Sequence, residues 1–377
     1  MLLFGYPKNN VLYHPMKRLL FIPCWTTNVK AYTIIHVLFC LFTLWGCKES
    51  YPNAELLKSS DFQKKASLQG EVLHLDSLWI ASQIYIQDSI LVVVETQMSP
   101  FVRLFNIKNG SKIGEFILAG RGPDELTACT QFQVTGDWIW AIDMVQGKYL
   151  KYRKKETLQD SFEKPVASFT LRDINIMYPI IIGSNIVAGC NLSTDSLFFF
   201  FDLEKQTIDT HVGIPFPFNI KGLGILRWRS FEYRMITDEE RIYVAYCHTD
   251  LIDIYDKTGL LIRRLWGPDH FMPDFEIRGV ENTGFMARPK EEARFSYFSP
   301  VITVDGLMVL YNGSLQKEHK YLNNKLFLFN SAGDPLIEFS LDTPIFNFYV
   351  DDTIKRIYGL TDNPDYQVIC YDYGAYL

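Results

Sequence analysis

A unit of about 50 residues recurs six times in the last 300 or so residues of this chain, and it limits the possible folds more than any other feature. Each copy has a turn with Asp or Asn, an apolar run, a polar break, a second apolar run that ends at a turn, and a third run. Equivalent positions, spaced by 48, 47, 56, 65 and 50 residues, are Leu91, Ile139, Ile186, Ile242, Leu307 and Ile357. Because one small sheet cannot bury both of its faces, this repetition predicts a radial array, an all-β, six-bladed β-propeller of four-stranded antiparallel blades.

The apolar runs are short and rich in Val, Ile, Tyr, Phe and Trp, and none keeps a helical period over three turns. No linker-like stretch interrupts the series, so residues 71–377 are expected to form one propeller domain. Insertions are expected at 271–292 and 313–321. The pattern leaves room for only a short last strand, so Glu71–Leu75 is expected to complete the last blade and cover its edge.

The propeller is preceded by a segment typical of exported proteins. Residues 31–46 are apolar but span only about 24 Å as a helix, too short for a bilayer core of about 30 Å. They follow Lys30 and end at Leu44-Trp45-Gly46-Cys47, which resembles the lipobox of bacterial lipoproteins. We therefore expect a signal peptide over residues 1–46 and a lipid anchor on Cys47, or alternatively an uncleaved N-terminal anchor.

The start of translation is open between Met1 and Met16, because Met16-Lys17-Arg18 is more typical of a signal peptide than the first residues are. Residues 47–70 are polar and are expected to be a tether between the lipid and the folded domain.

Charge argues against nucleic acid as a partner. The chain has 37 Lys and Arg against 43 Asp and Glu, and the first 46 residues contain four basic residues and no acid. From Cys47 onward the balance is therefore 33 against 43, a net charge of −10, which does not favour contact with phosphate backbones.

Four cysteines remain after Cys47, and no pair has the spacing of a metal site. Small buried hydrophobic residues are the favoured interpretation, with a disulfide left open; the four are Cys129, Cys190, Cys247 and Cys370. We expect no metal and no cofactor.

The heptapeptide Gly120-Arg121-Gly122-Pro123-Asp124-Glu125-Leu126 follows the first repeat. It resembles the G-x-G-P-x-E motif of the TolB-like six-bladed β-propeller lipoproteins of Bacteroides and related bacteria. The resemblance implies the propeller fold and localisation at the outer membrane, facing either the periplasm or the cell surface. It implies no activity. Its glycines and proline favour a structural turn rather than a phosphate-binding loop. Arg121 is expected to make an ion pair with a neighbouring blade or to contact an anion at the axis.

Ligands are expected to bind where the loops of one face converge on the axis. The segment Leu226–Arg234 combines three arginines with three aromatic residues, a composition common at interfaces, and an innermost strand is its alternative interpretation. Arg227, Trp228 and Arg229 are the predicted patch, and His270, at the start of the insertion, is a further candidate. The basic run Lys148–Lys155 is interpreted as a solvated outer hairpin.

These features predict a lipid-anchored binding or scaffolding module whose partner is an envelope protein or a glycan. A metal-assisted lyase or hydrolase, acting on a carbohydrate or lactone-like substrate at the axis, is the alternative. A structural part of a larger surface complex is a third possibility.

Overall fold

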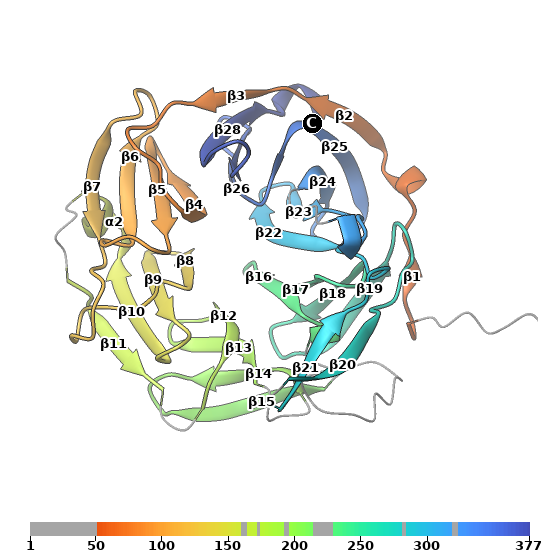
Figure 1. Cartoon of the computed structure of the whole chain (residues 1–377), viewed down its shortest axis with the longest axis horizontal. Coiled ribbons are helices and arrows are strands. Elements are labelled where there is room, and N and C mark those ends of the chain that lie inside the picture. Colours follow the sequence, from red (N-terminus) through yellow and green to blue (C-terminus); the bar gives the residue numbers. More distant parts are fainter. Residues whose placement is uncertain are drawn as a thin grey trace, which may run out of the picture. The chain divides into compact units, whose positions relative to one another are not determined.

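The computed structural model describes residues 51–159, 164–171, 174–191, 196–213, 229–280, 284–318 and 323–377. The predicted signal peptide and Cys47 lie outside these residues. From Tyr51 onward the chain forms one unit, in which six antiparallel sheets are arranged around a central axis (Figure 1). The predicted six-bladed propeller is confirmed.

Each blade is a meander whose first strand is nearest the axis. Blade 1 contains β4 (Ala81–Gln87), β5 (Ile90–Glu95), β6 (Val102–Asn106) and β7 (Lys112–Phe116). Blade 2 contains β8 (Gln131–Thr135), β9 (Trp138–Asp143), β10 (Lys148–Arg153) and β11 (Ala167–Thr170), with the short helix α2 (Lys154–Gln159) after β10. Blade 3 contains β12 (Met177–Ile181), β13 (Ile186–Cys190), β14 (Ser196–Asp202) and β15 (Thr207–Gly213).

The second half of the ring follows the same plan. Blade 4 contains β16 (Tyr233–Thr237), β17 (Arg241–Tyr246), β18 (Leu251–Asp256) and β19 (Leu261–Trp266). Blade 5 contains β22 (Tyr297–Thr303), β23 (Gly306–Tyr311), β24 (Asn323–Phe329) and β25 (Pro335–Ile345), with the 3-10 turn η2 (Gln316–Glu318) between β23 and β24. Blade 6 contains β26 (Asn347–Asp351), β27 (Arg356–Thr361), β28 (Gln367–Asp372) and β3 (Gly70–Leu73). A 3-10 turn, η3 (Gly374–Tyr376), ends the chain.

The six positions taken as equivalent in the sequence all lie in the second strand of a blade. The expected closure is also present: β3 pairs antiparallel with β28, with Val72 opposite Ile369 and Leu73 opposite Val368. The N-terminal part of the folded chain thus completes the last blade and leaves no unpaired edge on β28.

Residues 47–70 were expected to be a tether, and this expectation is wrong from Tyr51 onward. β1 (Glu55–Leu56) adds in parallel to the outer edge of blade 4, and β2 (Lys64–Leu68) adds in parallel to the outer edge of blade 5. A 3-10 turn, η1 (Ser59–Asp61), joins them. We call residues 51–73 the strap, because they run along the outside of three successive blades (Figure 1). The strands of the strap could not be predicted from the sequence, because an edge strand faces solvent on one side and needs few apolar residues.

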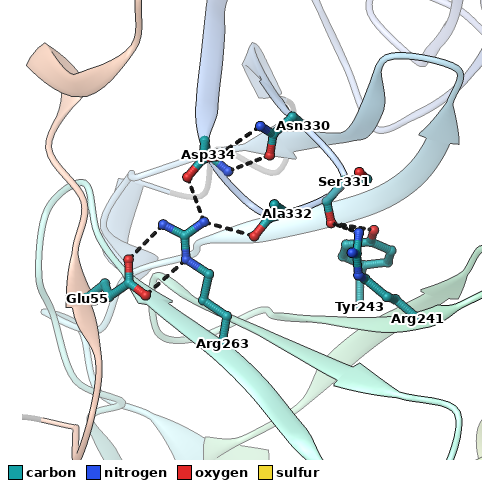
Figure 2. Close-up of polar contacts among 8 residues, drawn as sticks. All are labelled: Glu55, Arg241, Tyr243, Arg263, Asn330, Ser331, Ala332 and Asp334. Atoms are coloured by element: carbon teal, nitrogen blue, oxygen red, sulfur yellow. Dashed lines mark hydrogen bonds and ion pairs between the residues drawn. The ribbon is translucent and has the colours of Figure 1, made fainter.

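One arginine fastens the strap to two blades. Arg263 of β19 binds both carboxylate oxygens of Glu55 in β1, at 3.0 and 2.7 Å, and also binds Asp334 and the carbonyl of Ala332 in the next blade (Figure 2). Beside it, Arg241 and Tyr243 donate to the carbonyl of Ser331 in the same turn (Figure 2).

The core lies between the blades. Six clusters of buried apolar side chains are found in the described residues, and each cluster combines two neighbouring blades, including blade 6 with blade 1. Every blade therefore buries both faces only because it has a neighbour on each side. This is the physical reason for the sixfold repetition in the sequence.

The insertion expected at 271–292 contains a two-stranded hairpin, β20 (Phe275–Val280) paired with β21 (Gly284–Pro289). The second expected insertion contains η2, and its last residues lie outside the described part of the chain. Among the described residues, no helix is both long and apolar enough to cross a bilayer.

Candidate functional site

The strand order gives the ring two different faces. In every blade the loop between the second and third strands, and the link to the next blade, leave from the same end of the sheet. We call this the crossover face. The insertion with β20 and β21, the heptapeptide 120–126 and the segment that precedes β16 all belong to it. Long loops that converge around an axis are the usual place for ligand binding on such a scaffold.

The innermost strands surround a central channel with a cavity of about 440 Å³. Amide side chains from these strands cross from blade to blade. Gln133 of β8 binds both the N–H and the carbonyl of Ile181 in β12, at 2.7 and 3.0 Å. Gln83 and Asn347 accept hydrogen bonds from the N–H groups of Phe132 and Ile84 in the neighbouring blades. These amides satisfy edge groups of inner strands that have no strand partner.

Arg234 is the only charged residue among the described residues that line this channel. It is the second residue of β16, which enters from the crossover face, so it lies at that end of the channel. Its guanidinium stacks over the ring of Tyr178, 4.3 Å from the ring centroid. About a third of its side chain remains exposed.

Glu232 holds the charged groups of this region together. It accepts a hydrogen bond from Tyr178 at 2.8 Å, one from Arg229 at 2.6 Å and two from Arg234 at 3.2 Å. Burial alone would raise the pKa of Glu232, but the nearby His248 and the charges of Arg234 and Arg229 outweigh burial and lower that pKa to about 2. Glu232 is therefore ionised at neutral pH and is a poor proton donor.

His248 lies beside this group, with Nε2 3.8 Å from the Glu232 carboxylate. Its ring packs edge-on against Phe275 of β20 and near Phe295, with centroids 4.9 and 5.8 Å away. The side chain is 8% exposed, and its Nδ1 has no hydrogen-bond partner among the described residues. We call Tyr178, Arg229, Glu232, Arg234 and His248 the rim cluster.

Arg229 is the one predicted ligand-binding residue that the described structure places in the rim cluster. Arg227 and Trp228 lie outside the described residues. Sequence reasoning recognised Glu232 and Arg234 only as parts of a mixed segment, and it did not select Tyr178 or His248. Tyr178 comes from the preceding blade and has a positive φ of 48°, which no local pattern indicates.

His270 has a different environment. The N–H groups of Asp269, His270 and Phe271 all donate to the carboxylate of Asp250, at 2.7, 2.6 and 3.1 Å. Burial is the larger effect and raises the pKa of Asp250 to about 6, against the lowering effect of these three donors. The imidazole of His270 packs edge-on against Trp266. In the structure this segment is a loop organised around Asp250, with His270 as part of its framework.

The heptapeptide 120–126 forms the expected turn. Glu125 folds back to accept a hydrogen bond from the N–H of Gly122 at 2.7 Å, and Lys148 donates to the carbonyls of Gly122 and Glu125. Arg121 is exposed and makes no hydrogen bond or ion pair with another described residue. The interblade ion pair considered for it is therefore not formed within the described chain.

The interpretation of Lys148–Lys155 as a solvated outer hairpin is wrong. Residues 148–153 form β10, the third strand of blade 2, and Lys148 and Lys151 are buried. Lys151 donates to the carbonyl of Ser184 and the side chain of Asn185, and it lies over the ring of Trp138. Burial lowers the pKa of Lys151.

The cysteines Cys129, Cys190, Cys247 and Cys370 are free thiols in the structure. Among the described residues, no group of three or more His, Cys, Asp or Glu side chains is placed to hold a metal ion.

Solved structures that are similar to this chain include proteins from Bacteroides and from Myceliophteria thermophila. A member of the DUF4221 family from Bacteroides vulgatus has 10% identity and a TM-score of 0.54, over 81% of this chain and 95% of that chain. A candidate exported protein from Bacteroides fragilis has 12% identity and a TM-score of 0.49, over 84% and 99%. The β-propeller domain of Cps50 (Swd1) from Myceliophteria thermophila has 9% identity and a TM-score of 0.44, over 81% and 99%.

No curated protein matches the chain. A family model described as TolB-like 6-blade propeller-like matches residues 61–353, most of the folded part. The chain therefore belongs to the TolB-like six-blade propeller family.

Proposed function

We propose that this protein is an envelope lipoprotein, anchored through Cys47, that binds the anionic group of an envelope protein or glycan at the crossover end of its channel. The observation that carries the proposal is the position of Arg234, the single charge on the described channel wall, with about a third of its side chain exposed. Arg229 adds a second cation, so the two arginines and Glu232 together carry a net charge of +1. Arg227 and Trp228 precede this cluster directly in the sequence and are expected to extend it.

The geometry favours binding over catalysis. Glu232 is held ionised by two arginines, which makes it unsuited to donate a proton. The described channel wall presents amides, hydroxyls and one arginine, but no carboxylate, imidazole or thiolate that would hold a cation on the axis. The metal-assisted lyase or hydrolase considered above therefore has no support from the donor groups that line the channel.

A binding assay with two acidic probes tests the proposal. The probes are an oligogalacturonate and a glutamate-rich peptide, each fluorescently labelled, and they distinguish a glycan from a protein source. We expect one probe to bind the full chain and to lose about tenfold or more in affinity with Arg234→Gln or Arg229→Gln. Arg153→Gln is the matched control and should leave affinity unchanged. Arg153 is an exposed arginine at the end of β10, on the face opposite the crossover face. Equal affinity of all four proteins, or no binding of either probe, would overturn the proposal.

The strap supports the anchoring part of the proposal. Tyr51 is held against the propeller by a 2.9 Å hydrogen bond to Thr249 and by edge contact with Trp266. Three residues separate it from Cys47, so the two Cα atoms are at most about 14 Å apart. A lipid on Cys47 would therefore keep the folded ring close to the membrane surface. Cys47→Ala should move the protein from the membrane fraction to the soluble fraction, and continued membrane retention would contradict the anchor.

A further inference from the structure

A second hollow of the described surface lies away from the rim cluster. It is a groove with a cavity of about 720 Å³ on the face opposite the crossover face, between blade 6 and blade 1. The β4–β5 turn, the β26–β27 turn and the start of the β6–β7 turn surround it, and β3 and β28 form one wall. Its volume is in the range of about 300–1,000 Å³ that is usual for ligand sites. We call it the seam groove, because it follows the junction that the strap closes.

Aromatic and aliphatic side chains form about half of the lining of the seam groove. Tyr85 and Tyr349 meet edge to face with centroids 4.6 Å apart, and Tyr358 beneath them is fully buried. The walls carry aliphatic side chains, of which Val72 is 43% exposed and Ile354 is 50% exposed. Exposed aliphatic groups that line a hollow offer burial to an apolar side chain of a partner.

The rim of the seam groove is acidic. Four carboxylates line it against two cations, a net charge of −2; the six are Glu71, Asp88, Asp351, Asp352, Lys108 and Arg356. Asp351 and Asp352 each accept a backbone N–H, from Thr353 and Val304 respectively. Glu71 and Asp88 make no side-chain hydrogen bond or ion pair with any other described residue, so both are available to a basic ligand group.

We propose that the seam groove binds a short extended peptide segment of a partner protein, in which apolar side chains alternate with lysine or arginine. The aliphatic walls would bury the apolar side chains, and Glu71 and Asp88 would contact the basic ones. A neutral saccharide suits the groove less well, because it presents hydroxyl groups to the aliphatic walls and carries no positive charge to match the negative rim. The site is separate from the rim cluster and does not depend on the anionic ligand proposed for it.

Cys370 provides a built-in reporter for this site. It lines the groove and is partly buried, whereas the other three described cysteines are buried elsewhere in the ring. A bound peptide should therefore slow the reaction of Cys370 with a maleimide. Mass spectrometry of the peptide that contains Cys370 separates this signal from the cysteines of the N-terminal segment.

The test uses a fluorescent decapeptide of alternating leucine and lysine, with the full chain and fluorescence anisotropy as the readout. We expect saturable binding together with protection of Cys370. Ile354→Trp should fill the groove and weaken binding about tenfold. Ile113→Trp is the matched control, because Ile113 is equally exposed, at 49%, but lies on the outer strand β7 outside the groove. Glu71→Gln combined with Asp88→Asn should weaken binding and reduce its salt dependence.

Four outcomes would overturn the proposal. The decapeptide could bind without protecting Cys370, or bind both tryptophan variants equally, which would place it elsewhere on this acidic protein. An equivalent decapeptide of leucine and glutamate could bind as tightly, which would remove the role of the rim. A neutral oligosaccharide such as maltohexaose could protect Cys370 where the decapeptide does not, which would make the groove a saccharide site.

Discussion

At the scale of single residues, Glu232 shows how a buried charge is stabilised in this ring. Its side chain is 9% exposed, and the cost of burying it is offset by Arg229, Arg234 and Tyr178 from two blades. The folded state therefore prefers the ionised form of Glu232 far more than the unfolded chain does. The stability that results is fully present above pH 4.5, the ordinary pKa of the group, and is lost as pH falls toward 2.

The first prediction concerns Glu232→Gln. The substitution should lower the free energy of unfolding at pH 7 by about 2–3 kcal/mol, since it leaves two arginines without their carboxylate. The difference from the wild type should shrink to less than half at pH 3, because Glu232 is then protonated in the unfolded chain but still ionised in the folded protein, which removes most of its contribution. Urea unfolding at the two pH values measures both. A difference independent of pH would show that the loss comes from packing rather than from charge.

Residues whose partners come from distant strands, such as Glu232, could be predicted from the sequence only in part. The composition of Leu226–Arg234 pointed to the correct segment, and Arg229 does lie in the rim cluster. Tyr178 and His248 reach the same place from other strands, and only tertiary structure brings them together. The prediction of a solvated hairpin at Lys148 and Lys151 was wrong for a related reason. Their amines donate hydrogen bonds to backbone carbonyls and to a side-chain amide of segments distant in the sequence. A local charge pattern cannot reveal such partners.

At the scale of elements, the inner strands have an unusual task, because they are edge strands that face one another around a channel. Their free N–H and carbonyl groups cannot pair with the next blade, and amide side chains take over part of that role. The side-chain amide of Gln133 bonds to both backbone groups of one residue. It accepts from the N–H of Ile181 and donates to the carbonyl of Ile181. These amides link neighbouring blades at the axis, beside apolar side chains of the interblade clusters.

The second prediction concerns Gln133→Leu. It should lower the free energy of unfolding by about 1–3 kcal/mol, since the N–H of Ile181 loses its partner. Hydrogen exchange of the Ile181 amide should accelerate as well. Gln131→Leu is the matched control in the same strand, because the Gln131 amide makes a single long contact of 3.5 Å, with Gln83. Equal losses for both variants would show that the channel needs only polar side chains and no specific bonds.

Strand positions were largely predictable, and strand additions were not. The second strands could be located because each carries a run of buried apolar residues beside a turn, as Ile90–Glu95 and Arg356–Thr361 do. β1 and β2 instead carry exposed, polar residues such as Glu55, Lys64 and Lys65. Their place is set by backbone pairing to an edge that already exists, and backbone pairing leaves little trace in a sequence.

At the scale of the whole molecule, stability depends on closing the ring without a covalent bond. The last blade combines three C-terminal strands with β3, so the two ends of the folded chain meet in one sheet. This arrangement was predictable, because the repeat left the last blade one strand short. In the closed sheet Glu71 lies directly opposite Cys370, and a free thiol therefore sits at the junction itself.

The third prediction uses this pair. Glu71→Cys places two cysteines at opposed positions of adjacent antiparallel strands, a separation that suits a disulfide. Under oxidising conditions the bond should form and raise the free energy of unfolding by about 2–4 kcal/mol, since it links the ends of a loop that includes almost the whole ring. Ellman titration and thermal unfolding measure bond formation and stability.

Two comparisons decide what the disulfide result means. The same variant under reducing conditions should be no more stable than Glu71→Ser, because neither protein then has a covalent closure. If the oxidised protein also unfolds more slowly than the reduced one, opening of the seam between β3 and β28 is an early part of unfolding. If the bond forms but unfolding is unchanged, the ring opens first at another junction, and the closure by the strap is not its weakest point.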